Sequence, residues 1–398
     1  MSSLFDCDQR RKTIFYPKTD VVPGDFYPAL RVTRDRDIER LMPVVHDICK
    51  HRWSQPPVLV TPITSGGTYQ LLFIVEIDPS RRSPQGLAPQ GERGFASARG
   101  EESRQARLEP FERFVIRLNR LPQHISWEFY IDHWAYRQLA ALGLPGPEVV
   151  AVDVSRDHCP TDYQIMTYVD AKPLNIFEDP ETQYMDPALL QAVGRYVARV
   201  HTVPLNGFGP LSIASCARPE LVEEFERSIP HGIHASWRDY IFLRLEEHLE
   251  VCQRSGALIA TEVNQIQKLF EQHREIFDFG QPVWLHGDLG NHNMLSRDGV
   301  TLTALIDWED SMSGDPIFDI AFWGTFFRDH MLHDFLEGYQ QVKPLPHDFY
   351  QRYWLYYLRI ALSKTVHRIR FGYTDRPGRP PASQRIQKAL SKMQTLGV

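Results

Sequence analysis

The sequence lacks the features that mark secreted, membrane and nucleic-acid-binding proteins. Its five cysteines are odd in number, scattered, and form no Cys-x-x-Cys pair, so neither a disulfide framework nor a zinc site is indicated. No apolar run approaches the roughly 20 residues that span a bilayer, and the N-terminus MSSLFDCDQRRK has no signal-peptide stretch. The net charge of −6 argues against a nucleic-acid binder, which needs a basic surface. These absences predict a cytoplasmic protein with reduced thiols, bound to neither nucleic acid nor membrane.

The composition that is present is that of an ordinary globular protein. The chain is 42% hydrophobic and 24% charged, and its length suits two domains or one two-lobed enzyme with a sizeable core. One segment departs from this balance: residues 79–110 are rich in Pro, Gly, Ser and Arg and almost devoid of large apolar side chains. Such a segment cannot bury enough surface to offset its ordering entropy, so it predicts a disordered insertion between two strands.

The stretch 283–320, VWLHGDLGNHNMLSRDGVTLTALIDWEDSMSGDPIFDI, contains a hairpin signal surrounded by polar residues. The dipeptide Asp298-Gly299 lies between two apolar runs, and Gly tolerates the positive φ that tight hairpin turns demand. Folding the chain about this dipeptide puts Asn293 opposite Ala304. Asp307 then lies about three residues further along, on the order of 10 Å from Asn293 at the backbone. An amide oxygen and a carboxylate at one end of a hairpin could share a hard divalent cation.

The polar residues before this hairpin have the spacing of a phosphoryl-transfer site. His286, Asp288 and Asn293 follow the pattern His-x-Asp-x-x-x-x-Asn, in which protein kinases use the Asp to accept the substrate proton and the Asn to bind Mg²⁺. Asp307 follows one hairpin later, but Trp-Glu comes after it where protein kinases have Phe-Gly. The pattern HGDLGNHNML…ALIDWED…GDPIFDIA instead resembles the aminoglycoside phosphotransferase and choline kinase group of small-molecule kinases. Within that group it is most similar to the hygromycin B phosphotransferases, from about residue 58 onward.

The resemblance implies an α+β fold of the bilobal, protein-kinase-like type, with a small antiparallel β N-lobe and a mainly helical C-lobe. Residues 1–50 are expected to form an N-terminal extension with a helix, because apolar residues from 38 to 48 recur close to helical spacing. The N-lobe is expected at 51–168, with the insertion inside it. The C-lobe is expected at 169–398, with the catalytic loop, the metal site and the acceptor pocket.

Two parts of the expected N-lobe are candidates for nucleotide contacts. Between strands expected at 58–60 and 70–77 lies a turn with two glycines, where backbone N–H groups can approach phosphate oxygens; in isolation, most such turns are only tight hairpins. A strand expected at 163–168 runs into a small-residue turn that matches the hinge between kinase lobes, whose backbone would bond the adenine edge. The candidate residues are Ser65, Gly66, Gly67 and Thr68 in the turn, and Thr167, Tyr168 and Val169 in the hinge.

An arginine occupies the strand position where protein kinases carry a lysine that contacts the α- and β-phosphates. This residue is Arg117, and the resemblance implies that hygromycin phosphotransferases also have Arg there. A helix is expected at 126–142, since Gly143 can end it. Asp132 in this helix is the expected partner of Arg117, and Glu128 is the alternative. A surface or strand-edge arginine with ordinary surface carboxylates is the other interpretation of these residues.

These residues predict an ATP-dependent phosphotransferase that acts on a hydroxyl of a small polar molecule, such as an aminoglycoside-like compound, a sugar or an amino alcohol. Asp288 would take the hydroxyl proton, assisted or braced by His286, and Asn293 and Asp307 would hold Mg²⁺. A catalytically inactive nucleotide-binding relative is one alternative, suggested by Arg117 in place of Lys. An atypical protein kinase is the other, although the Asp-Phe-Gly and Ala-Pro-Glu landmarks are missing.

The helices expected at 237–252 and 262–277 bear on the acceptor. In the resembled family, helices between the hinge and the catalytic loop form the acceptor wall. An acidic wall would favour a cationic acceptor, although acidic helix faces are usually only solvated. The acidic residues concerned are Glu246, Glu247, Glu250, Glu262 and Glu271.

Several further polar residues are expected to be structural or to border the site. Asp319 would accept hydrogen bonds from the backbone of the catalytic loop, and His201 would pack inside the protein. Glu309 and Asp310 are close enough in sequence to Asp307 to reach an acceptor or a metal. A metal site at the two nearby histidines is not expected, because no third ligand is near. These two are His330 and His333.

Overall fold

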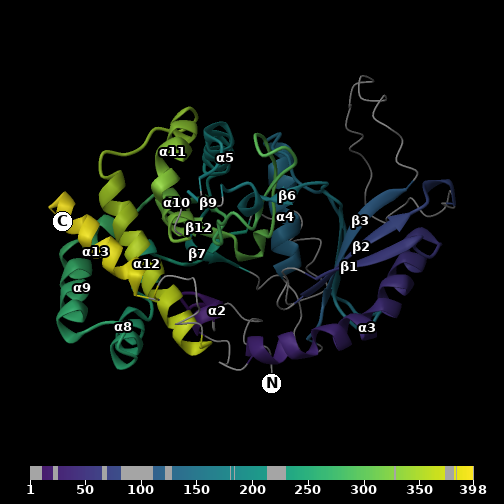
Figure 1. Ribbon diagram of the computed structural model, residues 1–398, viewed down its shortest axis with the longest axis horizontal. Helices are drawn as coiled ribbons and strands as arrows, with labels where there is room; N and C mark the ends of the chain where they lie inside the picture. Colours follow the sequence, from purple (N-terminus) through teal and green to yellow (C-terminus); the bar gives the residue numbers. More distant parts are fainter. Residues whose placement is uncertain are drawn as a thin grey trace. The chain divides into compact units, whose positions relative to one another are not determined.

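The computed structural model describes residues 11–20, 26–64, 70–81, 111–121, 128–179, 181–182, 184–212, 230–326, 329–372, 381 and 383–397 (Figure 1). The chain divides into two compact units. Unit 1 comprises Met1–Tyr27, Trp127–Pro147 and Val169–Val398, and unit 2 comprises Pro28–Ser126 and Glu148–Tyr168. None of the helices in the described part of the chain is both long and apolar enough to cross a membrane.

Unit 2 contains a five-stranded antiparallel sheet with the strand order β1-β2-β3-β5-β4. Alternate residues of β2 are buried, because successive side chains of a strand point to opposite faces. The antiparallel N-terminal sheet expected from the sequence is therefore confirmed. Its strands are β1 (Leu59–Ile63), β2 (Gln70–Ile77), β3 (Glu112–Asn119), β4 (Val149–Asp153) and β5 (Tyr163–Thr167), with a short 3-10 turn η1 (Pro79–Arg81) after β2.

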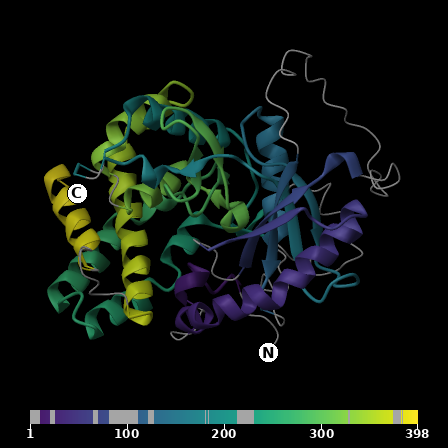
Figure 2. The same ribbon diagram turned by 45° about the vertical axis from the view of Figure 1, so that its right-hand side comes forward.

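Helix α3 (Phe26–Trp53) packs along one face of this sheet, as both views of the ribbon show (Figures 1 and 2). Its buried residues Leu41, Val45 and Ile48 share one core with Phe73 of β2 and its neighbours. The expected division, which set residues 1–50 apart as an extension, differs from this arrangement. The helix is also longer than expected and includes Pro43, because burial against the sheet outweighs the local cost of proline.

Helix α4 (Glu128–Ala141) groups with unit 1, although the sequence-based division placed it in the N-lobe. The physical reason is its packing against η8 (Trp308–Asp310), a 3-10 turn of unit 1. The helix ends at Ala141, and Gly143 follows it as the expected helix-ending glycine, with a φ of +64° that is readily available to glycine.

Unit 1 combines two small sheets with most of the helices. One sheet has the order β11-β10-β6 and the other β8-β7-β12-β9. Helix α12 (Phe349–Arg370) is almost entirely buried along its middle, so it forms the centre of the unit. The remaining strands are β6 (Lys172–Pro173), β7 (Phe208–Leu211), β8 (Gly232–His234), β9 (Val283–Leu285), β10 (Met294–Ser296), β11 (Leu302–Leu305) and β12 (Met312–Gly314).

Aspartates cap two of the helices in unit 1. Asp186 accepts a hydrogen bond from the Ala188 N–H at the start of α5 (Pro187–Val200), and Asp315 does the same for Ile317 in α10 (Pro316–Gly324). The other helices are α2 (Pro17–Asp20), α7 (Trp237–Phe242), α8 (Leu245–Arg254), α9 (Ala260–Gln272), α11 (Leu332–Gln340) and α13 (Gln384–Leu396), with 3-10 turns η4 (Leu174–Ile176), η7 (Arg274–Phe277) and η9 (Asp329–Met331).

Two helices expected from the sequence are interrupted. The stretch 237–252 breaks into α7 and α8, because Arg244 adopts a left-handed φ of +55°. The stretch 262–277 ends as a helix at Gln272 and continues as η7. The overall expectation of an antiparallel N-terminal sheet followed by a mainly helical C-terminal region is confirmed.

Candidate functional site

Strand β9 leads directly into the loop His286–Asn293, which we call the central loop. Asp319 of α10 accepts hydrogen bonds from the backbone N–H groups of His286 (2.6 Å) and Gly287 (3.0 Å). The Asp319 carboxylate also lies 3.3 Å from the Nε2 atom of buried His201. The expected scaffold role of Asp319 and the packed position of His201 are therefore confirmed.

Gly287 fits where another residue would not. Its φ is +82°, and a Cβ at this position would lie 2.0 Å from the carbonyl oxygen of Asp310. A side chain would therefore combine left-handed backbone strain with a backbone clash.

We expect Gly287→Ala to lower the free energy of unfolding by at least about 2 kcal/mol, from the strain and the clash together. Urea denaturation followed by circular dichroism measures this change. Gly280→Ala is the matched control, because its Cβ would meet nothing within 4 Å and the change should stay within about 0.5 kcal/mol. Equal stability of the two variants would contradict the tight fit of the loop.

Both ring nitrogens of His286 are engaged inside the protein. Nδ1 accepts a hydrogen bond from the Asp288 N–H at 3.2 Å, and Nε2 lies 3.0 Å from the carbonyl oxygen of Ile306. Because a carbonyl only accepts, Nε2 carries the proton. The ring is 1% exposed and packs on Trp308, with centroids 4.5 Å apart. This geometry favours the bracing role for His286 over proton transfer.

The hairpin register differs from the expected one by two residues. Leu295, not Asn293, pairs with Ala304, and the Asn293 carbonyl accepts a hydrogen bond from the Ile306 N–H at 2.8 Å. Asp307 is therefore one residue beyond the partner of Asn293, not three residues beyond it. The two expected metal ligands stand closer along the hairpin than the sequence predicted.

The Asp298 side chain explains this shift. Its carboxylate accepts hydrogen bonds from the backbone N–H groups of Val300 (2.9 Å) and Thr301 (2.8 Å). These backbone donors lower the pKa of Asp298 well below its usual value. The carboxylate thus holds a wider loop between Ser296 and Leu302, with a register irregularity beside it. The tight two-residue turn expected about Asp298-Gly299 is therefore not formed.

Asp307 has a left-handed backbone, with φ +68° and ψ +59°, and helix α4 holds the peptide groups around it. The Asp307 N–H donates to Tyr136 Oη at 3.3 Å, and the Trp308 N–H donates to Asp132 Oδ1 at 2.9 Å. Asp132 and Tyr136 are one helical turn apart, so they reach neighbouring peptide groups. Sequence reasoning did not assign Tyr136.

Arg117 lies on β3 in unit 2 and Asp132 in unit 1, so their expected pairing stays a prediction. The Arg117 guanidinium is buried between two amides. It donates to Gln70 Oε1 at 2.8 Å and to Gln164 Oε1 at 3.0 Å. These contacts hold the side chain in the sheet and weigh against a solvated strand-edge arginine.

Asp288 and Asn293 come together within the central loop. The Asn293 amide nitrogen donates to the Asp288 carbonyl at 3.0 Å, which leaves the amide oxygen for a ligand. The Asp288 side chain is 12% exposed, and its Oδ2 lies 3.9 Å from His292 Nε2. The amide oxygen of Asn293 and the carboxylate of half-buried Asp307 have the hard-oxygen chemistry that Mg²⁺ prefers.

Asn291 is a second residue that sequence reasoning did not assign. Its amide donates to Glu178 Oε1 and accepts from Trp323 Nε1, both at 2.8 Å. The Asn291 carbonyl also accepts from the Leu174 N–H at 3.0 Å. One asparagine thus joins the central loop to η4 and α10. In the sequence, the only hint of this role was the position of Asn291 in the motif Asn291-His292-Asn293.

The expected nucleotide contacts are described only in part. The turn from Ser65 to Thr68 lies outside the described residues. The N–H groups of Thr167 and Tyr168 donate to the carbonyls of Glu148 and Arg113, at 2.9 and 3.1 Å. An adenine ring bound beside residues 167–168 would therefore have to bond to backbone atoms other than these two N–H groups. Val169 belongs to unit 1.

The acidic residues of α8 and α9 are largely used locally. Glu247 pairs with Arg244 at 2.5 Å and Glu250 with Arg254 at 3.8 Å. Glu262 Oε2 accepts from the Ile259 N–H at 2.8 Å. Glu246 accepts from Gln267 and Glu271 pairs with Arg274. These contacts favour ordinary solvated helix faces over an acidic acceptor wall.

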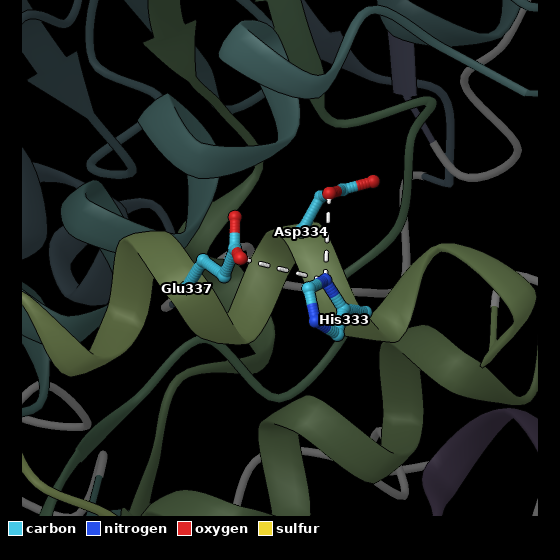
Figure 3. A group of neighbouring side chains, drawn as sticks. All are labelled: His333, Asp334 and Glu337. Atoms are coloured by element: carbon cyan, nitrogen blue, oxygen red, sulfur yellow. Dashed lines mark ion pairs between the residues drawn. The ribbon is translucent and has the colours of Figure 1, made fainter.

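One expectation about the C-terminal histidines needs correction. His333 does have two carboxylates nearby, from Asp334 and Glu337 on the same helix α11 (Figure 3). One ligand atom from each of the three residues lies within 4.8 Å of the others. His333 is 79% exposed, and Glu337 also accepts a hydrogen bond from Gln191. This arrangement is that of neighbouring charges on an exposed helix face, and we assign no metal to it.

Comparison with known proteins identifies the family. The family model described as "Phosphotransferase enzyme family" matches residues 96–360. Hygromycin-B 4-O-kinase from Escherichia coli is 28% identical over 238 residues, which is 56% of this chain and 60% of that protein. The match therefore spans less than two thirds of this relative's length.

Solved structures show the same fold at low sequence identity. A thermostable mutant of aminoglycoside phosphotransferase APH(4)-Ia, in ternary complex with AMP-PNP and hygromycin B, has a TM-score of 0.55 at 19% identity, covering 87% of this chain and 97% of that chain. APH(2")-IIia with GDP and kanamycin has a TM-score of 0.52 at 13% identity, covering 89% and 98%. The match of the family model over most of the chain is decisive: the chain belongs to the phosphotransferase enzyme family.

Proposed function

We propose that this phosphotransferase moves the γ-phosphoryl group of ATP to a hydroxyl of a small polar molecule. The observation that supports the proposal most directly is that Asn293 joins the segments of Asp288 and Asp307: its amide binds the Asp288 carbonyl, and its carbonyl binds the N–H of Ile306, the residue before Asp307. Hydrogen bonds hold the backbone beside these residues: the Gly287 N–H donates to Asp319, the Asn293 amide to the Asp288 carbonyl, and the Trp308 N–H to Asp132. A fixed arrangement suits phosphoryl transfer, which depends on alignment and charge neutralisation more than on covalent help from the protein.

In the proposed reaction, the acceptor hydroxyl gives its proton to Asp288 as its oxygen attacks the γ-phosphorus. A new oxygen–phosphorus bond forms while the bond between the γ-phosphorus and the bridging oxygen breaks, and ADP leaves. Asn293 and Asp307 would hold Mg²⁺, which neutralises phosphate charge when bound. Arg117 is the proposed contact for the α- and β-phosphates, and Asp132 its proposed partner.

The relatives support a nucleotide donor and an aminoglycoside-like acceptor without fixing either for this chain. One relative is named for hygromycin B, and solved relatives hold AMP-PNP with hygromycin B or GDP with kanamycin. We therefore propose aminoglycosides, other sugars and amino alcohols as the acceptor classes to test first. The local pairing of the carboxylates on α8 and α9 gives no independent support for a cationic acceptor.

An acceptor screen with the purified chain tests the proposal. ADP release would be measured with Mg²⁺ and either ATP or GTP, against hygromycin B, kanamycin, simple sugars and choline. We expect nucleotide-dependent phosphorylation of at least one hydroxyl compound, identified by a mass increase of one phosphoryl group. Failure to bind ATP or GTP in the presence of Mg²⁺ would contradict the proposal.

A further inference from the structure

The segment Arg11–Asp20, which we call the N-terminal segment, precedes the region matched by the family model and yet is built into unit 1. Its last residues form α2, which lies beside α12 (Figure 1). Phe15 and Thr19 are buried. Thr19 Oγ1 donates to the Ser363 carbonyl of α12 at 3.4 Å. The N-terminal segment is therefore packed into unit 1.

A buried charged cluster anchors this segment. Asp20 accepts hydrogen bonds from the N–H groups of Phe15 (2.8 Å) and Tyr16 (2.9 Å), and its other oxygen lies 2.7 Å from His248 Nε2. Arg359, fully buried, contacts His248 Nδ1 at 3.1 Å and lies 3.4 Å above the Phe15 ring. Desolvation lowers the pKa of Arg359 to about 10. Detaching the segment would remove the Asp20 carboxylate from buried His248 and the Phe15 ring from buried Arg359, which is unfavourable.

A row of aromatic side chains connects the N-terminal segment with Asp288. The Tyr16 ring lies 6.2 Å from Phe322, Phe322 lies 5.9 Å from Phe326, and Phe326 lies 5.4 Å from His292. His292 in turn lies 3.9 Å from the Asp288 carboxylate. We call these four rings the aromatic ridge. Three of them, Tyr16, Phe326 and His292, are partly or largely exposed.

A lysine adds positive charge to this ridge. The Lys364 ammonium lies 3.4 Å from the Phe326 ring centroid and 4.0 Å from that of Phe322. The same lysine, with Phe15 and Tyr16, lines a narrow hollow whose wall also includes Gly287 of the central loop. The ridge thus begins at the N-terminal segment, runs past a cation and ends at the proposed base.

We propose that the aromatic ridge is part of the acceptor site and that Tyr16 is a specificity-determining residue. The acceptor places its hydroxyl at Asp288 and stacks a flat apolar portion on the ridge, an arrangement in which aromatic rings gain energy beyond area burial. Lys364 makes a neutral or anionic apolar portion more favourable there than a cationic one. This inference rests on the proposed function, since it takes Asp288 as the base.

A pair of sugars that differ by one flat group tests the inference. Methyl glucoside and 4-nitrophenyl glucoside would be titrated against the full chain with AMP-PNP and Mg²⁺, by calorimetry. The wild type is expected to bind the nitrophenyl compound about 5-fold more tightly. Tyr16→Ala abolishes this preference, whereas Tyr16→Phe keeps it. Tyr350→Ala, an exposed tyrosine about 20 Å from Lys364 along α12, also keeps it.

Contrary outcomes are readily distinguished. No preference in the wild type, binding of neither glucoside, or a preference that survives Tyr16→Ala would each overturn the inference. Tyr16→Leu keeps apolar bulk without a flat ring, so it gives the same test if Tyr16→Ala does not fold. AMP-PNP affinity, titrated separately, should change less than about twofold in every variant. If the wild type itself did not bind AMP-PNP, that result would instead count against the proposed function.

Discussion

Replacing Asp288 by Asn is expected to reduce phosphoryl transfer by about 10²–10⁴-fold, the usual contribution of a positioned general base. Asn has the same shape and still accepts hydrogen bonds, but it cannot take a proton at neutral pH. The loop should survive the change, because Asp319 holds the backbone N–H groups of His286 and Gly287. The substitution also leaves the backbone carbonyl of residue 288, which accepts a hydrogen bond from the Asn293 amide, in place.

Single-turnover kinetics and nucleotide titration together measure this effect. The expected pattern is a large fall in the rate of the chemical step with an AMP-PNP affinity close to wild type. Asp278→Asn is the matched control, because Asp278 is 48% exposed and pairs only with Arg238 among its described contacts. A wild-type rate in Asp288→Asn would remove Asp288 from the role of base.

The sequence was most informative where one motif set several residues at fixed spacing. The strand leading to His286 and the scaffold carboxylate Asp319 could both be predicted, because the pattern covers each of them; the role of Asp288 as base stays a prediction. The role of Asp319 is now seen directly in its two backbone hydrogen bonds. The alternation of apolar residues in β2 likewise predicted its buried face.

The hairpin register could not be predicted from the Asp-Gly dipeptide. Two-residue turns and wider loops share this signal, and the choice depends on where the Asp298 carboxylate finds its donors. Here it binds the N–H groups of Val300 and Thr301. The error of two residues kept the side-chain faces and changed only the distance, since side chains alternate with a period of two.

Contacts between distant segments were also beyond the sequence. Tyr136 and Asn291 act through side-chain hydrogen bonds to backbone groups or side chains that lie far away along the chain. No local pattern distinguishes such a tyrosine from one that only packs. The same holds for α3, whose helical periodicity was visible but whose packing on the sheet was not.

Side chains of helix α4 are hydrogen-bonded to the backbone at the expected metal ligand Asp307. Tyr136 and Asp132 accept hydrogen bonds from the two peptide N–H groups on either side of the Asp307 Cα. The direction of the Asp307 carboxylate therefore depends on α4 as well as on the hairpin. In this arrangement Asp132 has a positioning contact that is independent of any pairing with Arg117.

Asp307→Asn is the second change with a large expected effect. Removing one negative charge from a hard-cation site should weaken Mg²⁺ binding and lower phosphoryl transfer by about 10²–10³-fold. Asn is the informative substitution, because it tolerates the left-handed backbone that Asp307 adopts at φ +68°. Asp307→Ala would mix loss of the charge with backbone strain.

The measurement is Mn²⁺ binding followed by electron paramagnetic resonance, with and without AMP-PNP, alongside the Mg²⁺ dependence of ADP release. We expect a weaker Mn²⁺ affinity, and a rate that recovers in part at high Mg²⁺ because mass action refills a weakened site. Asp179→Asn is the matched control, since among the described residues that carboxylate accepts hydrogen bonds only from Glu181 and Thr182 of the local turn. Unchanged Mn²⁺ affinity in Asp307→Asn, with a rate still lowered, would mean that Asp307 shapes the loop without binding the metal.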